Sequence, residues 1–353
     1  MSQELRLLLH GATGRMGRKR HLEGALMQLA KSEFNLEISL AGRNKEALNQ
    51  VSKEYGLSVA GSAEQALTDK SFDLFFECTS PMIRAGLLTT AMRSGVGVYT
   101  EKPLALSLES AQSLNALAKQ SGVFNGIVQD KLFTKGYIAA KKAISENLLG
   151  AIYDIRCEFG YWVETGKAGK PMNRPSWNFK KDQGGSLIAD IYSHWNYMIE
   201  SIDSIQNVYA LAKTHISERV DETGKLFPVT TEDLSHVIFE TANGITGSIY
   251  TSWLTRPKTP FTMKISGSTG TLIVTPDSAL LFKNNSTEDL IEKFAINSED
   301  EFLEQWRLVL DALIYEKSVD FGFDSALRQV EFCAALEQSI NEKRMISVGG
   351  FTK

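Results

Sequence analysis

An acid and an imidazole stand together in the stretch GGSLIADIYSHWNYM, residues 184–198, which is otherwise mostly apolar. The four-residue gap between Asp190 and His194 places both on one face of a helix predicted over 187–202, within reach of a shared substrate. An imidazole titrates near neutral pH, so such a pair could carry a proton to or from a substrate. The alternative is a structural Asp/His pair that is satisfied by hydrogen bonds. Metal binding is not expected, because no third ligand is spaced nearby.

A second charged pair follows an apolar run. Residues 99–104 read YTEKPL and come directly after Val96 to Val98, so Glu101 and Lys102 leave the end of a predicted buried strand. Both charges are costly to bury, and Pro103 restricts the backbone just after them. Either this is an exposed turn, or the strand end holds a lysine at a site.

A glycine-rich turn, Gly11 to Gly17 with the sequence GATGRMG, lies between the first predicted strand and the first predicted helix. Glycines in that position let the backbone approach a pyrophosphate, whose charge is met by the amides at the helix N-terminus. The turn therefore predicts dinucleotide binding. The residues expected to contact the cofactor there are Gly11, Ala12, Thr13, Gly14, Arg15 and Met16.

The end of the second predicted strand, Leu36 to Ala41, bears on the choice of dinucleotide. An acid at this position would bind the ribose 2′-hydroxyl of NAD, whereas an arginine would suit the 2′-phosphate of NADP. The strand runs into Ala41-Gly-Arg-Asn44, with no acid at the tip. Arg43 is therefore predicted to contact the cofactor, and NADP is favoured over NAD. The alternative is that Arg43 is an ordinary solvated turn residue.

The arrangement of predicted elements indicates two domains. Residues 1–130 alternate short apolar runs with helical patterns, which is typical of a doubly wound parallel sheet covered by helices. Residues 131–353 cluster extended segments and end in two helices, which favours an α+β domain on a largely antiparallel sheet. The closing helices could pack back on the first domain. The fold class is α/β overall, with the first domain binding dinucleotide and the second binding substrate.

The bulk composition excludes several classes of protein. A net charge of -4, with acids and bases interspersed, gives no reason to expect nucleic acid or a membrane surface as a partner. Cys78, Cys157 and Cys333 have no disulfide or zinc spacing and are expected to be reduced thiols. The sequence shows neither a signal-peptide pattern nor an apolar run of the ~20 residues needed to span a bilayer. We expect a soluble cytoplasmic protein.

Taken together, the glycine-rich turn, Glu101-Lys102-Pro103 and Gly184-Gly185 followed by Asp190 and His194 resemble the glucose-fructose oxidoreductase/inositol dehydrogenase/rhizopine-catabolism (Gfo/Idh/MocA) family. The likeness covers nearly the whole chain. It implies a Rossmann domain joined to a second domain whose open sheet often mediates homodimers or homotetramers. By the same likeness, Cys78, Thr79 and Ser80 form a loop beside the cofactor.

The resemblance also implies hydride exchange between a nicotinamide and a hydroxyl-bearing carbon of a sugar, cyclitol or related polyol. By residue match, Lys102 would hydrogen-bond the reacting oxygen and contact the cofactor, His194 would be the general acid/base, and Asp190 would orient the substrate. Glu101 would neighbour the nicotinamide. The chain departs from the family pattern by one extra residue in the glycine turn, by Met82 and Ala85 where Asn and His are common, and by Tyr197 where an acid is frequent.

The segment before the Asp190/His194 helix suggests substrate contacts. Trp162, Arg174 and Trp177 offer aromatic faces and a cationic donor, which suit a polyhydroxylated ring. Alternatively the tryptophans pack the domain core. The five basic residues between Lys167 and Lys181 leave a carboxylate or phosphate substrate open. Two rival functions are a transient oxidation by tightly bound NAD during glycoside cleavage or epimerisation, and a cofactor-binding regulator without turnover. A regulator has no need of Lys102, Asp190 and His194 together.

Overall fold

The computed structural model describes residues 3–69, 72–283, 290–293 and 300–350. The chain divides into two compact units. Unit 1 comprises Met1–Phe133 and Glu299–Val330, and unit 2 comprises Thr134–Ser298 and Glu331–Lys353. No helix in the described ranges is long and apolar enough to cross a membrane.

Unit 1 is built on a six-stranded sheet in the order β3-β2-β1-β4-β5-β6, and every pairing in it is parallel. The order reverses between β1 and β4, as in doubly wound nucleotide-binding folds. The strands are β1 Glu4–His10, β2 Asn35–Ala41, β3 Ser58–Gly61, β4 Leu74–Glu77, β5 Gly97–Thr100 and β6 Asn125–Ile127. The predicted Rossmann sheet is confirmed.

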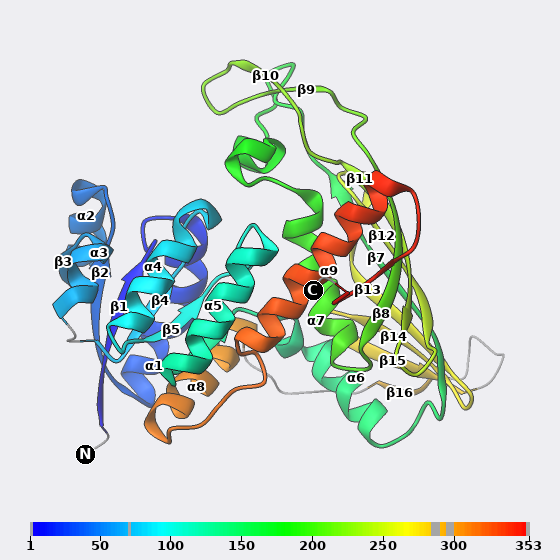
Figure 1. Cartoon of the computed structure of the whole chain (residues 1–353), viewed down its shortest axis with the longest axis horizontal. Coiled ribbons are helices and arrows are strands. Elements are labelled where there is room, and N and C mark those ends of the chain that lie inside the picture. Colours follow the sequence, from blue (N-terminus) through cyan, green and yellow to red (C-terminus); the bar gives the residue numbers. More distant parts are fainter. Residues whose placement is uncertain (1–2, 70–71, 284–289, 294–299, 351–353) are drawn as a thin grey trace. The chain divides into compact units, whose positions relative to one another are not determined.

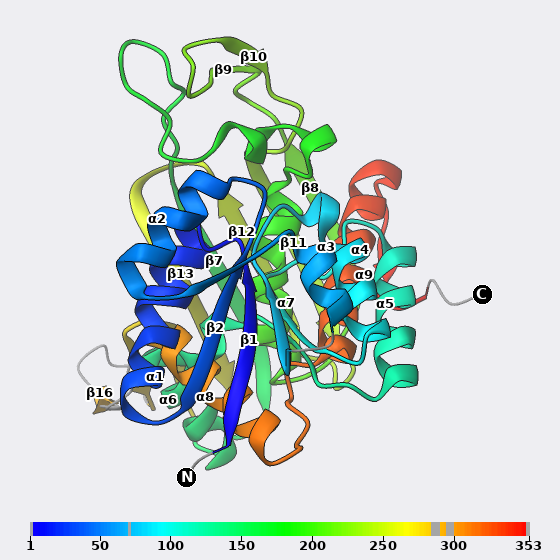
Figure 2. The same ribbon diagram turned by 90° about the vertical axis from the view of Figure 1, so that its left-hand side faces the viewer.

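Helices cover both faces of this sheet, so its central strands are buried on both sides (Figure 2). One layer packs on the face of Leu7 and Leu9, and the other on the face of Leu8. The first layer contains the helical segments η1 Met16–Leu26, α1 Met27–Ser32, α2 Lys45–Tyr55 and α8 Glu301–Ile314. The second contains α3 Ala63–Ala66, η2 Leu67–Asp69, α4 Pro81–Arg93, α5 Leu108–Ser121 and the start of α9 Phe323–Glu342. A short turn, η3 Asp130–Phe133, follows β6.

Unit 2 is built on a nine-stranded sheet in the order β16-β15-β14-β13-β7-β12-β11-β8-β17 (Figure 1). Only the β12–β7 pair among these neighbours is parallel, so the predicted, largely antiparallel sheet is confirmed. Its strands are β7 Ile152–Trp162, β8 Ile205–Lys213, β11 Leu234–Thr241, β12 Thr246–Ser252, β13 Leu254–Gly267, β14 Thr271–Thr275, β15 Ser278–Phe282, β16 Leu290–Lys293 and β17 Ile346–Ser347.

One face of this sheet is covered within the chain, and strand β11 shows the strict alternation that this requires. The covering helices are α6 Lys135–Ser145, α7 Ser193–Glu200 and the C-terminal part of α9. The other face exposes Leu211 and Ile238, each more than half exposed. Away from the sheet lie the turns η4 Ser176–Phe179 and η5 Lys181–Gln183 and the hairpin of β9 Glu218–Val220 with β10 Leu226–Pro228.

Two predicted α-helices begin with π-helical winding. The segment after the glycine turn is a π-helix through Leu26 before α1 begins, and η6 Ile188–Tyr192 is a π-helix that leads into α7. A π turn holds more residues than an α turn and is often found at functional sites. Asp190 therefore lies on π-helical backbone and His194 on the first turn of an α-helix, rather than both on one regular α-helix.

Candidate active site

The glycine-rich turn follows β1 at the carboxyl edge of the unit 1 sheet, and close backbone contacts require two of its glycines. Gly11 has φ +104°, and a Cβ there would lie 2.4 Å from the carbonyl oxygen of Cys78. A Cβ on Gly17 would lie 2.3 Å from the carbonyl oxygen of Gly11. The tip of the turn, Thr13 to Arg15, is exposed, whereas Ala12 is buried. The turn is thus packed tightly at its base and open at its tip, which suits a dinucleotide phosphate.

The loop after β4 lies directly beside this turn. His10 at the end of β1 pairs in register with Glu77 at the end of β4, and Gly11 packs on Cys78. Ser80 then caps α4 by accepting a hydrogen bond from the Met82 amide at 3.4 Å. Cys78 and Thr79 are half-buried and Ser80 is exposed. The structure therefore brings the two predicted cofactor segments of unit 1 together.

A buried ion pair joins the strand-end loops of β4 and β5. Arg84 of α4 is 1% exposed and donates from Nε to Glu77 Oε2 at 2.5 Å. Its other nitrogens donate to the carbonyl oxygens of Pro103 and Thr79. Burial alone would raise the pKa of the Glu77 carboxyl, but the Arg84 charge, the nearby His10 ring and hydrogen bonds from Thr79 and Arg84 lower it to about 2. Glu77 is therefore an anion that holds Arg84 between the two loops.

Glu101 lies at the end of the next strand along and is 8% exposed. Its Oε1 is 2.9 Å from His21 Nε2, and its Oε2 accepts a hydrogen bond from the Lys102 amide at 3.2 Å. Burial raises its pKa, but the His21 hydrogen bond and the Lys102 charge bring it below the ordinary value. Lys102 itself is half-buried, and the Lys102–Pro103 peptide bond is cis.

His21, Cys78 and Glu101 offer ligand-type atoms within 4.8 Å of one another. However, Trp306 Nε1 lies 3.0 Å from His21 Nδ1 and can only donate, so the ring hydrogen must be on Nε2, which faces Glu101. Burial and the charges of Glu101 and Glu77 raise the pKa of the Cys78 thiol well above its ordinary value. A protonated nitrogen and a protonated thiol are poor ligands, so the grouping does not suit a metal ion.

Arg43 lies two residues beyond the end of β2, whose last residue Ala41 pairs with His10 of β1. It is exposed, and it makes no hydrogen bond or ion pair to any residue that the structure describes. The neighbouring Asn44 caps α2 through its side chain, which accepts from the Ala47 amide at 3.1 Å. The Arg43 guanidinium thus stands at the same sheet edge as the glycine turn.

In unit 2, Asp190 forms an ion pair with Arg174, which also donates to the Tyr161 hydroxyl at 2.9 Å. The Arg174 guanidinium lies over the Trp253 ring, 4.2 Å from its centroid. Burial lowers the pKa of Arg174, but the charges and hydrogen bonds of Asp190 and Tyr161 together raise it above its ordinary value. The ion pair thus gives Asp190 a cationic partner. Arg174, predicted to bind substrate, therefore also acts on Asp190, while its own buried Nε has no partner in the described part of the chain.

An aromatic wall connects Arg174 with His194. It consists of Trp253, Phe159 and Phe261, with Phe159 stacked on Phe261 at 4.1 Å and packed edge-on against Trp253 at 6.0 Å. Phe261 in turn lies edge-on to the His194 ring at 5.6 Å. Asp190, Arg174 and His194 are thus gathered along one apolar surface within unit 2.

His194 is 8% exposed, and its Nδ1 lies 2.6 Å from the hydroxyl of Tyr197. Tyr197 is itself buried, at 2% exposure. The tyrosine therefore provides a polar partner for the imidazole where many members of the resembled family carry an acid. A hydroxyl orients the ring without placing a charge beside it.

The two predicted substrate tryptophans differ in their surroundings. The Arg256 guanidinium lies over the ring of Trp162, with its central carbon Cζ 3.5 Å from the ring centroid. The buried Nε1 of Trp162 has no hydrogen-bond partner among the described residues. Trp177 is 40% exposed in η4. The structure thus supports Trp162 as a hydrogen-bond donor more than Trp177.

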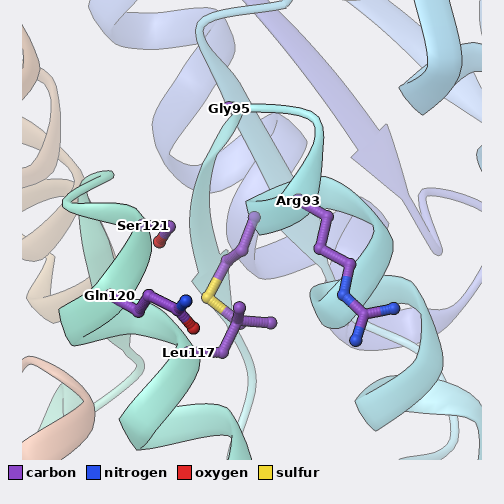
Figure 3. Close-up of a pocket in the computed structure, with 6 residues that line it drawn as sticks. Arg93, Gly95, Leu117, Gln120 and Ser121 are labelled. Atoms are coloured by element: carbon purple, nitrogen blue, oxygen red, sulfur yellow. The ribbon is translucent and has the colours of Figure 1, made fainter.

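A surface pocket of unit 1 lies at the other edge of the sheet (Figure 3). It is lined by Met92, Arg93, Gly95, Leu117, Gln120 and Ser121. These residues come from the C-terminal ends of α4 and α5. Helices run opposite to the strands in such a unit, so the pocket lies at the amino edge, away from the glycine turn and Lys102.

Sequence reasoning missed several residues of this site: His21, Glu77, Arg84, Trp253 and Trp306. A weak signal existed for two of them. Glu77 ends the apolar strand LFFE, and Arg84 stands alone in the apolar segment PMIRAGLL. A lone charge in such a setting must be paired when buried. Its partner could not be named from the sequence.

Comparisons with known proteins agree with this architecture. Residues 5–127 match the oxidoreductase family with an NAD-binding Rossmann fold, and residues 137–273 match the GFO/IDH/MocA C-terminal domain. D-xylose dehydrogenase of Paenarthrobacter nicotinovorans is 31% identical over 382 aligned positions, covering 99% of this chain and 98% of that protein. 1,5-Anhydro-D-fructose reductase of Ensifer adhaerens is 27% identical over 38% of each chain.

Among solved structures, levoglucosan dehydrogenase in complex with NADH superposes with a TM-score of 0.87. The two sequences are 20% identical, and the match covers 98% of this chain and 99% of that one. The resemblance predicted from the sequence motifs is therefore confirmed. The chain belongs to the Gfo/Idh/MocA family and is an NAD(P)-dependent dehydrogenase.

Proposed function

We propose that this protein transfers hydride between a nicotinamide and a hydroxyl-bearing carbon of a neutral sugar or related polyol. The observation that carries the proposal is the likeness to D-xylose dehydrogenase along 99% of the chain. Trp162 Nε1 and Arg174 Nε support it: both are buried with no hydrogen-bond partner among the described residues, and buried donors of this kind suit substrate hydroxyl groups.

Lys102, His194 and Asp190 are proposed to act on one substrate. The bound nicotinamide supplies the hydride acceptor in oxidation and the donor in reduction. During oxidation His194 takes the hydroxyl proton, with Tyr197 holding the other ring nitrogen. The Lys102 ammonium stabilises negative charge developing on the oxygen. Asp190, paired with Arg174, accepts a hydrogen bond from the substrate and fixes its orientation.

Substrate charge is the first test. Lys167 lies 3.8 Å from Glu218, Lys181 lies 2.9 Å from Glu232, and Arg174 is paired with Asp190. Because these cations already have acidic partners, a substrate carboxylate would gain little from them. We expect kcat/KM for D-xylose or D-glucose to exceed that for D-glucuronate by about tenfold or more, a difference of about 1.4 kcal/mol. Steady-state nicotinamide absorbance measures both, and a preference for the acid would contradict the neutral-substrate proposal.

Replacing His194 with alanine should remove the limb near neutral pH from the pH profile of kcat/KM, and lower the maximal rate by about 10²–10⁴-fold. The rate of oxidation otherwise falls as pH decreases, because a protonated imidazole cannot accept the proton. His215→Ala is the matched control, since this histidine is 52% exposed and pairs with Asp233 away from the proposed site. If His194→Ala kept the limb, the imidazole would be structural.

NADP is proposed as the preferred dinucleotide because of the exposed Arg43 beside the glycine turn. Arg43→Ala should weaken NADPH binding about tenfold and leave NADH binding within about twofold. Titration of nicotinamide fluorescence gives both constants. Arg93→Ala removes an exposed arginine from the opposite sheet edge and should change neither. Equal losses of affinity for NADPH and NADH in Arg43→Ala would contradict the proposed preference for NADP.

We also propose that the exposed face of the unit 2 sheet pairs with a second copy of the chain in a homodimer or homotetramer. Leu211 and Ile238 supply apolar surface there. Light scattering of the purified protein tests this, and a monomeric mass would contradict it.

A further inference from the structure

A chain of buried hydrogen bonds within unit 1 ends at the backbone of Lys102. Trp306 Nε1 of α8 donates to His21 Nδ1 at 3.0 Å, and His21 Nε2 lies 2.9 Å from Glu101 Oε1. Glu101 Oε2 accepts a hydrogen bond from the Lys102 amide at 3.2 Å. The aromatic rings of Phe76 and Phe302 pack against His21 at 4.4 and 5.0 Å.

The direction of each bond follows from the chemistry of the groups. An indole N–H can only donate, so His21 Nδ1 must accept and the imidazole hydrogen must be on Nε2. His21 then donates to the Glu101 carboxylate, which can only accept while it is ionised. Trp306 therefore selects the one neutral tautomer of His21 that binds Glu101, as a partner on one ring nitrogen commonly does for the other.

The His21 and Trp306 members of this series of hydrogen bonds are sealed from solvent. His21 and Trp306 are 0% exposed, so water does not compete for their hydrogen bonds. Besides His21, the titratable groups that act on Glu101 are Lys102, Asp130, Cys78 and Tyr99. Of these, the Lys102 charge favours the carboxylate and the Asp130 charge opposes it. A buried carboxylate without the His21 donor would be poorly satisfied and free to change rotamer.

We propose that His21, locked by Trp306, is a positioning residue that holds Glu101 so that Glu101 fixes the backbone of Lys102 at the strand end. The inference rests on the proposed catalytic role of Lys102, and it adds two residues far from the motif itself. A catalytic cation displaced by about 1 Å can lose about 10²-fold in rate, so its backbone must be held firmly.

Two variants of His21 separate positioning from packing. His21→Leu fills the space without a donor, and His21→Gln retains an N–H where Nε2 lies. Leu22→Ala is the matched control, because Leu22 is also fully buried in η1 but makes no hydrogen bond to Glu101. Trp306→Phe, which keeps an aromatic ring beside Phe76 and Tyr99 but removes the N–H, replaces His21→Leu if that variant does not fold.

Hydrogen exchange at the Lys102 amide, read by mass spectrometry, and steady-state kinetics are the measurements. In His21→Leu we expect that exchange to accelerate about tenfold or more, and kcat to fall about 10- to 100-fold with KM within about threefold. His21→Gln should restore both within about threefold. Leu22→Ala should lower the melting temperature without changing the exchange rate at the Lys102 amide or kcat.

The other possible outcomes would overturn parts of this proposal. Unchanged exchange at Lys102 in both His21→Leu and Trp306→Phe overturns the positioning role. Equal effects in His21→Gln and His21→Leu overturn it as well, because packing would then explain them. Faster exchange with unchanged kcat overturns the catalytic part of the inference. Lys102→Met then shows whether the proposed function has failed: a retained rate in that variant contradicts the function itself, and a lost rate leaves it intact.

Discussion

Replacing Lys102 with methionine is expected to lower kcat/KM by about 10²–10⁴-fold, with most of the loss in kcat. The side chain keeps its length and apolar stem but loses the ammonium that would stabilise charge on the substrate oxygen. Its loop is held by Arg84 through Pro103 and by Glu101 through the Lys102 amide, so the backbone should stay in place. Initial rates over a range of substrate concentrations, with cofactor saturating, measure the split between kcat and KM.

The control for this variant is Lys119→Met, which removes a lysine that is 62% exposed and paired with Asp324 on the surface. Its kinetics should match those of the unmodified protein. Binding of NAD(P)H to Lys102→Met, followed by fluorescence, shows whether the cofactor site is intact. A kcat/KM within a few-fold of the original would mean that Lys102 does not act on the reacting oxygen.

Replacing Arg84 with methionine should lower the free energy of unfolding by about 3–5 kcal/mol, because it leaves the Glu77 carboxylate buried without its cation. Glu77 is 0% exposed, and the guanidinium is also the donor to the carbonyl oxygens of Thr79 and Pro103. Denaturant unfolding followed by fluorescence measures the loss. Activity should fall as well in the folded fraction, because both loops at the sheet edge lose a common donor.

A double variant, Glu77→Leu with Arg84→Met, removes both charges. It should recover at least half of the stability lost in Arg84→Met, because replacing a buried pair by apolar side chains is often nearly neutral. Removing the surface pair of Lys119 and Asp324 should cost less than about 1 kcal/mol. If the double variant were as unstable as Arg84→Met, the lost packing of the long side chain would explain the effect instead of the uncompensated charge.

The same ion pair should make the free energy of unfolding depend on pH in the acid range. The pKa of Glu77 is lowered from 4.5 to about 2 in the folded state. Unfolded chains therefore bind this proton more readily, so the stabilisation is complete above about pH 4.5 and decreases as pH falls toward about 2. This stabilisation amounts to about 3 kcal/mol. In Glu77→Gln this part of the acid dependence should be absent from unfolding curves.

The sequence alone determined the class of the fold and most of the central strands. Buried parallel strands must be apolar on both faces, so β1 and β4 appear as nearly continuous apolar runs. Strand β3, Ser58–Gly61, was not predicted, because it lies at the sheet edge and its side chains are largely exposed. The π-helical winding also escaped prediction, since the buried positions Leu22, Ala25, Leu26 and Leu29 suit an α-helix equally well.

Local motifs were readable because their chemistry is local. A glycine turn, a strand-end lysine and an Asp/His pair each lie within a few residues, and their spacing alone suggested a site. Their partners were not readable: Trp306 reaches His21 across 285 residues, and Arg174 pairs with Asp190 from a loop. Hydrogen bonds and ion pairs between distant segments depend on which buried groups the tertiary fold brings within about 3 Å. The sequence thus determined which residues carry the chemistry, and only the folded structure decided which side chains hold them in place.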